Sequence, residues 1–327
     1  MKIWASRYAL KSHASLGGHA LSQERHGALI RIEVQSGLVG YADLHPWTEL
    51  GDIDLDEQLK LLSQNQTTAL SARSLMLARM DLDARSRSVS AFAGLMIPQS
   101  HFLATDIRGL STEDLADAWT DGFRIIKLKL GRNIGSEIEK LHVLEKSLLR
   151  FRLRLDFNSL LNPTSIAVFL ESLPPALVEA IELVEDPIPW NAKTWAKLQE
   201  QTGVAFALDR ISEGEIAHLH EAQGSFRWIA VKPAVQEARR MAAVAAELGV
   251  RVFVTSYLDH PVGQSGAALE AARLGVVETC GLVSSRAFVS NEFSERLVWM
   301  GPEFIPAEGT GIGFDDLLAK QNWQALG

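Results

Sequence analysis

The pattern of apolar and polar positions divides the chain near residue 100. Before it, residues 28–34 and 38–43 alternate apolar and polar side chains on either side of a glycine-containing turn, which predicts paired antiparallel strands. From 55 to 87, leucines and alanines recur at helical spacing. The first part of the chain therefore predicts a small α+β domain in which helices follow the sheet.

From residue 101 onward, short apolar runs alternate with segments of helical pattern. Strands are predicted at 101–104, 123–131, 151–157, 180–185, 204–208, 226–231, 250–256 and 276–281. Helices are predicted at 112–121, 136–149, 163–172, 192–201, 213–220, 235–248 and 263–274. This alternation favours a closed parallel barrel. An open doubly wound sheet fits less well, because the chain has no Gly-x-Gly-x-x-Gly turn.

The predicted fold class is α/β: a modified TIM-like (β/α) barrel of seven or eight units with an N-terminal α+β capping domain. The end of the chain, 302–327, contains a glycine-rich turn at 308–313 and is expected to leave the barrel and pack on the capping domain. The predicted domains are therefore 1–95 for the capping domain, 96–300 for the catalytic barrel and 301–327 for the returning tail.

Composition and charge limit the class of protein. The net charge of −8 and the lack of a basic run argue against a nucleic-acid surface. One cysteine, Cys280, excludes an internal disulfide and suits a reducing cytosol. There is no signal-peptide pattern and no apolar stretch long enough to span a membrane. The expectation is a cytoplasmic protein with a small-molecule substrate and no membrane partner; the oligomeric state is left open, and a monomer is compatible with the sequence.

The segment 123–131 is the first with candidate chemistry. Alternation places Lys127 and Lys129 on one face and Ile126, Leu128 and Leu130 on the other. In isolation this pattern describes an edge strand with a solvated face. In a barrel whose helices cover the outside, the apolar face meets the helices and the lysines point into the barrel.

Polar residues also stand at the ends of the next predicted strands. Asp156, Glu185, Asp209 and Lys232 follow one another at intervals of one strand–helix unit. Because neighbouring strands lie about 4.8 Å apart, carboxylates on three successive strand ends can converge on one cation. Oxygen ligands with no softer donor beside them predict Mg²⁺, with Mn²⁺ as the other candidate. On strand 151–157, Arg152, Arg154 and Asp156 share a face that is expected to point into the barrel.

Two lysines flank the predicted metal site. A lysine must be neutral to accept a proton, and a nearby divalent cation or second ammonium group lowers its pKa. The chemistry this suggests is removal of a proton α to a carboxylate, with the metal holding the enediolate. A lysine base with Mg²⁺ is the pattern of the enolase superfamily.

The ordered motifs resemble the muconate-lactonizing-enzyme branch of that superfamily. They are Lys-Leu-Lys at 127–129, Arg-Leu-Asp-Phe-Asn at 154–158, Val-Glu-Asp-Pro at 184–187, the strand-end Asp209 and Val-Lys-Pro at 231–233. Within the branch, Arg154 and the segment 40–47 are most similar to the o-succinylbenzoate synthases. The resemblance covers nearly the whole chain.

The resemblance implies a carbon–oxygen lyase of menaquinone biosynthesis. The reaction is the syn dehydration of 2-succinyl-6-hydroxy-2,4-cyclohexadiene-1-carboxylate to o-succinylbenzoate. Lys129 would remove the α proton and then help the hydroxyl leave, Lys232 would stabilise the enediolate, and Lys127 would tune Lys129. The implied metal ligands are Asp156, Glu185 and Asp209. The implied substrate contacts are Arg154, Asn158, Ser256, Gly281, Ser284 and Trp47.

Some positions depart from the family pattern: Arg210 replaces a usual Glu, Asp43 replaces another, and the segment 256–260 contains Asp259 and His260 instead of the usual sequence. Alternatives therefore stay open. The nearest is an N-acylamino acid racemase or another cycloisomerase or epimerase of the branch. A Schiff-base barrel using Lys129 or Lys232 is more distant, because it would leave three aligned carboxylates unexplained. A non-catalytic binding barrel comes last.

Overall fold

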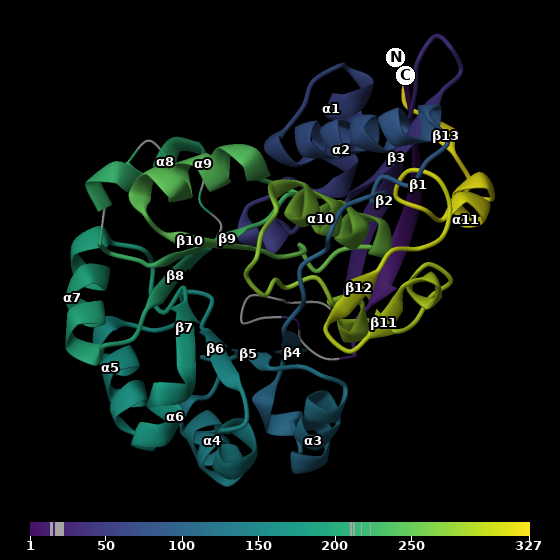
Figure 1. Ribbon diagram of the computed structural model, residues 1–327. Coiled ribbons are helices and arrows are strands. Elements are labelled where there is room, and N and C mark those ends of the chain that lie inside the picture. The colour runs from purple at the N-terminus through teal and green to yellow at the C-terminus, as the bar shows by residue number, and fades with distance from the viewer. Residues whose placement is uncertain (14–15, 17–22, 210, 212, 217, 223) are drawn as a thin grey trace.

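The computed structural model describes residues 1–13, 16, 23–209, 211, 213–216, 218–222 and 224–327. Its first unit is a four-stranded antiparallel sheet in the order β13-β1-β2-β3 (Figure 1). The strands are β1 (Lys2–Lys11), β2 (Glu24–Glu33), β3 (Val39–Leu44) and β13 (Gln324–Ala325). Two helices, α1 (Leu55–Ser63) and α2 (Ala69–Ser86), pack on this sheet. The prediction of sheet before helices is confirmed, although the single helical stretch is two helices.

The second unit is a curled parallel sheet in the order β10-β9-β8-β7-β6-β5-β4. Its strands are β4 (Phe102–Ala104), β5 (Ile125–Lys129), β6 (Arg152–Asp156), β7 (Ile181–Glu185), β8 (Phe206–Asp209), β9 (Trp228–Val231) and β10 (Arg251–Val254). Single bridges Thr255–Gly281 and Ser100–Cys280 join its two edges through the segment around 280. The predicted eighth strand at 276–281 is therefore reduced to isolated bridges, and the TIM-like barrel is confirmed.

Helices cover the outside of the barrel (Figure 1). They are α3 (Thr112–Thr120), α4 (Ile134–Leu148), α5 (Pro163–Glu171), α6 (Pro175–Ala180), α7 (Ala192–Thr202), α8 (Glu213–Ile216), α9 (Ala238–Leu248) and α10 (Pro261–Leu274). Several begin at a side-chain cap: Ser111, Asn133, Asn162 and Asn191 each accept a hydrogen bond from the backbone N–H three residues on. The sequence pattern missed α6, a short helix that starts at the Pro174-Pro175 pair.

On β5 and β6, the side chains divide between an outward face that meets the helices and an inward face. Ile126 and Leu128 of β5 are fully buried in the main hydrophobic core. Arg154 of β6 is buried inside the barrel at 0% exposure. Arg152 was expected on the same interior face, but it is exposed at the start of β6, where its guanidinium donates to the carbonyl of Glu179. The inward face of β6 is thus polar only from Arg154 onward.

The tail returns to the first sheet. After β11 (Val298–Met300) and β12 (Glu303–Ile305), helix α11 (Asp315–Ala319) leads to β13, which pairs with β1 beside the N-terminus (Figure 1). Arg85 of α2 binds this segment through Asp315 at 2.5 Å, and the buried carboxylate of Asp81 accepts from the backbone N–H of Ile312. These contacts agree with the expected course of the tail; the domain boundaries themselves stay predictions.

In the part of the chain that the structure describes, no helix has both the length and the apolar character needed to cross a membrane.

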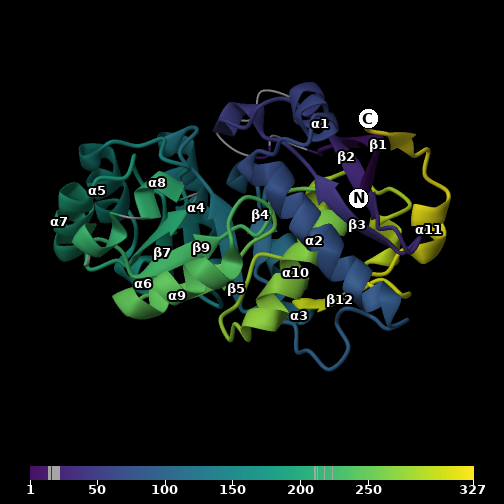
Figure 2. The same cartoon turned by 90° about the horizontal axis from the view of Figure 1, so that it is seen from above.

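The two units lie side by side, with α2 and α10 running between them (Figure 2). At this boundary two acidic side chains are buried together: Asp43 on β3 and Asp259 just before α10. Gly263 of α10 has room only for a hydrogen there, because a Cβ would lie 2.6 Å from Oδ2 of each carboxylate. Burial raises the pKa of Asp259 to about 7 and, together with the charge of Asp259, raises the pKa of Asp43 well above its usual range.

Aromatic and imidazole groups enclose the Asp43 carboxylate. The Tyr8 hydroxyl of β1 donates to its Oδ1 at 2.6 Å and lies 2.9 Å from Nδ1 of His45. The backbone N–H of His260 donates to its Oδ2 at 3.1 Å. Burial lowers the pKa of both His45 and His260 to about 3, so neither imidazole brings a positive charge to the acid pair at neutral pH.

We expect Asp259→Asn to stabilise the protein at neutral and alkaline pH. A folded-state pKa of about 7 against an ordinary value of 3.8 means that the protonated carboxyl stabilises the fold fully below about pH 3.8. That contribution is lost as pH rises through the folded-state pKa. The free energy of unfolding of the wild type should therefore fall relative to that of Asp259→Asn between these two values. Urea unfolding at several pH values measures the difference, and Asp117→Asn, at an exposed aspartate of α3, is the control. A constant difference between Asp259→Asn and wild type across the pH range would contradict the expectation.

Candidate functional site

A cavity of about 340 Å³ opens at the carboxyl ends of the barrel strands. Parallel strands present their last residues at this end, which is where barrel enzymes place their active sites. The first unit closes one side of the cavity with Leu16, Trp47 and Leu50. Barrel residues that line it include Lys127, Lys129, Asp156, Asn158, Asp209, Lys232, Ser256, Gly281 and Ser284.

Lys127 joins two of the expected metal ligands. Its Nζ donates to both carboxylate oxygens of Glu185, at 2.7 and 2.8 Å, and lies 2.9 Å from Oδ2 of Asp156. The pair register aligns Lys129 with Asp156 and Asp156 with Glu185, so the three strands β5, β6 and β7 end at one level. Burial would lower the pKa of Lys127, but Asp156 and Glu185 outweigh it and raise that pKa, so Lys127 stays charged.

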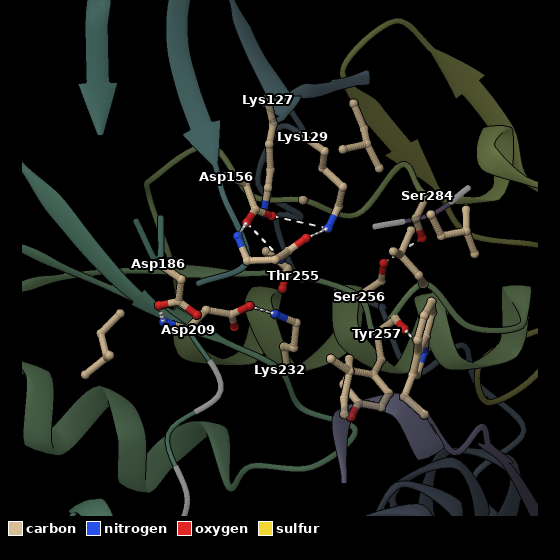
Figure 3. A pocket seen from close by; sticks show the side chains of 18 of the residues that line it. Lys127, Lys129, Asp156, Asp186, Asp209, Lys232, Thr255, Ser256, Tyr257 and Ser284 are labelled. Atoms are coloured by element: carbon tan, nitrogen blue, oxygen red, sulfur yellow. Dashed lines mark hydrogen bonds and ion pairs between the residues drawn. The ribbon is translucent and has the colours of Figure 1, made fainter. Parts of the chain in front are cut away.

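Lys129 extends into the same space from β5 (Figure 3). Its Nζ lies 3.3 Å from Oδ2 of Asp156 and donates to Oδ1 of Asn158 at 3.2 Å. Asn158 is held in turn, because its backbone N–H and its side-chain amide both donate to Oδ1 of Asp156. Burial lowers the pKa of Lys129, and the charge of Lys127 adds to this effect against the opposing charge of Asp156. The surroundings therefore raise the pKa of Lys127 and lower the pKa of Lys129, although both lysines belong to β5.

Lys232 faces this group from the position directly after β9, which three strands separate from β5. Its ammonium group is hydrogen-bonded to Oδ2 of Asp209 on β8 (Figure 3). Its backbone N–H donates to Oε1 of Gln236 at 2.7 Å, which fixes the strand end. Asp186 supports the neighbouring strand: its Oδ1 accepts from the backbone N–H of Asp209 at 3.0 Å. Asp186 also lines the cavity.

Asp156, Glu185 and Asp209 lie on the adjacent strands β6, β7 and β8. All three are buried carboxylates with no sulfur or imidazole ligand among them, which is the donor set that fits Mg²⁺ or Mn²⁺. Among the described residues, no three acidic, histidine or cysteine side chains converge closely enough to form a metal site in the arrangement seen here. Each of these carboxylates is instead ion-paired with a lysine.

Hydroxyl and aromatic groups form the far wall of the cavity. The hydroxyls of Ser256 and Ser284 are 2.5 Å apart (Figure 3). Trp47 is fixed by its indole N–H, which donates to the carbonyl of Tyr257 at 2.8 Å, and by the guanidinium of Arg25 over its ring. The structure thus brings Ser256, Ser284, Gly281 and Trp47 to the cavity, as expected from the sequence.

Arg154 is the expected substrate contact that the structure does not bring to the cavity. It lies within the barrel, where Nε donates to Glu182 at 2.6 Å and Nη1 donates to the carbonyl of Thr279 at 2.7 Å. His260 and Asp259 belong to the buried acid pair at the boundary of the two units. Arg210, which departs from the family pattern, lies outside the described residues.

Sequence reasoning missed several residues of the cavity wall: His101, Leu103, Thr255 and Trp190. His101 stands directly before β4, and its only sequence signal was a polar residue at the start of the first predicted barrel strand. Thr255 directly follows β10, and its hydroxyl is a buried polar atom without a hydrogen-bond partner among the described residues.

Comparisons with known proteins agree with this architecture. Residues 3–84 match the family model described as O-succinylbenzoate synthase, N-terminal domain, and residues 111–315 match Enolase C-terminal domain-like. A curated protein of Bdellovibrio bacteriovorus described as o-succinylbenzoate synthase is 32% identical over 334 residues, covering 100% of this chain and 99% of that one.

Solved structures of low sequence identity share the fold. The L-Ala-D/L-Glu epimerase from Bacillus subtilis has a TM-score of 0.81 at 17% identity, with 96% of this chain and 98% of that chain covered. The N-succinyl Arg/Lys racemase from Bacillus cereus has a TM-score of 0.81 at 14% identity, with 99% of each chain covered. A dipeptide epimerase from Enterococcus faecalis, complexed with Mg and a dipeptide, has a TM-score of 0.80 at 17% identity, with 95% and 98% covered. At these identities the likeness concerns the fold alone. The two family matches and the full-length relative go further: this chain belongs to the o-succinylbenzoate synthase family, an enzyme family of the enolase superfamily.

Proposed function

We propose that this protein is a Mg²⁺-dependent o-succinylbenzoate synthase. The reaction is the syn dehydration of 2-succinyl-6-hydroxy-2,4-cyclohexadiene-1-carboxylate to o-succinylbenzoate, a step of menaquinone biosynthesis. One observation carries the proposal: in a chain matched from end to end by a relative described as this enzyme, two lysines from opposite strands enter one cavity that Asp156 and Asp209 line. Glu185, on the strand between these two carboxylates, is not among the lining residues and is held by Lys127.

Lys129 is the proposed base. Its side chain is 11% exposed and lines the cavity, and its partners Asp156 and Asn158 orient it from one side. It would take the proton from the carbon that bears the substrate carboxylate. The same group, now an ammonium, would return that proton to the departing hydroxyl, so that a C–H and a C–O bond break, a C=C bond forms and water leaves. One group can serve both steps because a syn elimination keeps the proton and the leaving group on one face of the ring.

Lys232 would face the opposite side of the substrate and stabilise the negative charge that develops on the carboxylate oxygens. Lys127 stays charged between Asp156 and Glu185, which favours a fixed electrostatic role over proton transfer. Asp156, Glu185 and Asp209 are the proposed ligands of Mg²⁺, which when bound supplies positive charge to the substrate carboxylate and makes the α proton more acidic.

The cavity walls would hold the rest of the substrate. Trp47, Leu50 and Leu16 form an apolar side that excludes water from the ring, while Ser256 and Ser284 offer hydroxyl donors. Fixed donors in a water-excluded site interact with a developing charge more strongly than the same groups in water. Each of these wall residues remains a proposed substrate contact.

A single assay tests the proposal. Purified protein with MgCl₂ is given the cyclohexadiene carboxylate, and formation of the aromatic product is followed by absorbance and chromatography. Conversion that depends on the protein supports the proposal. No conversion above the uncatalysed rate, with folded protein and added Mg²⁺, would remove it.

The second candidate is an N-acylamino acid racemase. Lys129 and Lys232 come from β5 and β9, on opposite sides of the cavity, and two bases on opposite faces of one α carbon are what a racemase requires. Deuterium exchange at the α carbon of an N-succinyl amino acid in D₂O distinguishes the two functions. Exchange from both enantiomers together with no dehydration would favour the racemase.

A further inference from the structure

His101 is a buried side chain of the cavity that the proposed mechanism does not use. It is 3% exposed and lines the cavity together with Lys127 and Lys129. Its backbone is tied to the far edge of the sheet, because its N–H donates to the carbonyl of Cys280 at 2.8 Å. The ring is therefore anchored where the barrel closes.

Arg154 determines which nitrogen of His101 carries the proton. Nη1 of Arg154 lies 3.3 Å from Nδ1 of His101. A guanidinium has no acceptor, so Nδ1 must be the acceptor in this pair and the proton of the neutral ring must sit on Nε2. Arg154 is itself held by Glu182 and by the carbonyl of Thr279, so it cannot turn away. Burial, with the charges of Arg154 and Lys127, holds the pKa of His101 well below its ordinary value, which agrees with a neutral ring.

The other edge of the ring faces a second cavity residue. A Cβ placed on Gly281 would lie 2.9 Å from Cε1 and 3.0 Å from Nε2 of His101. Gly281 thus leaves the space that this edge of the imidazole occupies, and both residues line the cavity. Among the described residues, the ring makes its hydrogen-bond contact at Nδ1, with Arg154. The structure therefore holds a neutral N–H donor at the cavity wall, with its tautomer fixed from behind.

We propose that His101 binds the substrate, donating its Nε2–H to a carboxylate or carbonyl oxygen; this inference rests on the proposed function. The three lysines of the cavity are charged or proton-accepting groups, and each is engaged with a carboxylate. A neutral donor fixed by Arg154 adds recognition of an oxygen atom without adding a second charge beside the base. The buried Arg154 is then a positioning residue, which accounts for an arginine that does not reach the cavity.

Two substitutions test the contact. His101→Leu removes the donor at similar volume, and His101→Gln restores an N–H near the position of Nε2. With dehydration as the assay, we expect His101→Leu to raise KM about tenfold to hundredfold, the range for a lost hydrogen bond to a charged group, with a smaller change in kcat. His101→Gln should recover most of the loss. His26→Leu, at an exposed histidine with a side-chain exposure of 65%, is the matched control.

A merely structural role would lower thermal stability without this division between KM and kcat and without rescue by glutamine. An unchanged KM in His101→Leu would overturn the proposal. If that variant does not fold, the tautomer of His101 provides the test. ¹⁵N spectra of the wild type should show one histidine with Nδ1 unprotonated, and the absence of its signals in His101→Gln assigns them to His101. These signals should shift when o-succinylbenzoate is added to the wild type. A proton on Nδ1, or no shift on adding the product, would equally overturn it.

The experiments distinguish a failure of the proposed function from a failure of this inference. Dehydration by the wild type establishes the first, and the His101 variants then decide the second. If the wild type exchanges deuterium into an N-succinyl amino acid instead, the same comparison of KM values is made with that substrate. Inactivity toward both substrates would remove the proposed function and this inference with it.

Discussion

Lys129→Ala is expected to lower kcat for dehydration by about two to four orders of magnitude, the usual contribution of a positioned general base. The variant removes the group proposed to carry the proton both from the α carbon and to the leaving hydroxyl, so no other residue can complete either step. Lys127 cannot substitute for it, because Glu185 and Asp156 keep Lys127 protonated. Lys232 faces the cavity from β9, on the other side.

The loss should appear in kcat with little change in stability. Asp156 keeps Lys127 as its ion-pair partner at 2.9 Å when Lys129 is removed, so the buried carboxylate is not left without a counter-charge. Steady-state kinetics and thermal melts measure both quantities. Lys320→Ala, at an exposed lysine with a side-chain exposure of 71%, should behave as wild type. Full turnover by Lys129→Ala would exclude it as the base.

Removal of the divalent metal is expected to abolish dehydration, and added Mg²⁺ is expected to restore it. The reason lies in the charge of the site: Asp156, Glu185 and Asp209 are three buried carboxylates, two of them (Asp156 and Asp209) line the cavity, and the substrate would bring a further carboxylate into it. Without a cation, the charge that develops on the substrate as the proton leaves would be opposed by these groups. Treatment with EDTA followed by titration with Mg²⁺ or Mn²⁺ measures the dependence.

A binding measurement separates the metal site from catalysis. Mg²⁺ should raise the melting temperature of the wild type, because a ligand that binds only the folded state stabilises it. Glu185→Gln should lose this increase, since an amide keeps the shape of the side chain and an oxygen for Lys127 but not the charge. Glu171→Gln, at the exposed end of α5, is the matched control. Undiminished activity in excess EDTA would contradict the metal requirement.

The order of the chemistry along the chain could be predicted because a parallel barrel repeats a simple unit. Each strand end lies one helix away from the next, so polar residues that end successive apolar runs must meet at one rim. Asp156, Asp209 and Lys232 were found in this way, and all three line the cavity. Lys127 and Lys129 followed from the alternation of a single strand, once the helices were known to cover its other face.

Residues of other kinds could not be predicted, because their roles depend on partners far away in the sequence. Arg154 shares the inward face of strand β6 with Asp156, as alternation predicted, but the family resemblance implied that it contacts the substrate. Its guanidinium is instead used within the barrel by Glu182, Thr279 and His101, which come from three different segments. No periodicity along the chain predicts contacts between segments so far apart in the sequence.

The boundary between the two units also contains interactions that the sequence pattern could not predict. Asp43 and Asp259 were noticed only as departures from a family pattern, yet burial and the packing of Gly263 between them make them a pair with raised pKa values. The closing of the barrel is similar, since the predicted strand at 276–281 is only two bridges that depend on Ser100 and Thr255.

The strand–helix order, the capping unit before it and the residues at each strand end can be predicted from the amino-acid sequence, because they depend on local periodicity and on one repeated connection. Three features follow from the folded arrangement instead: which polar side chains face the cavity and which are held within the barrel, how the barrel closes, and which nitrogen of His101 carries a proton. Those outcomes depend on hydrogen bonds and packing between distant segments, which exist only once the chain is folded.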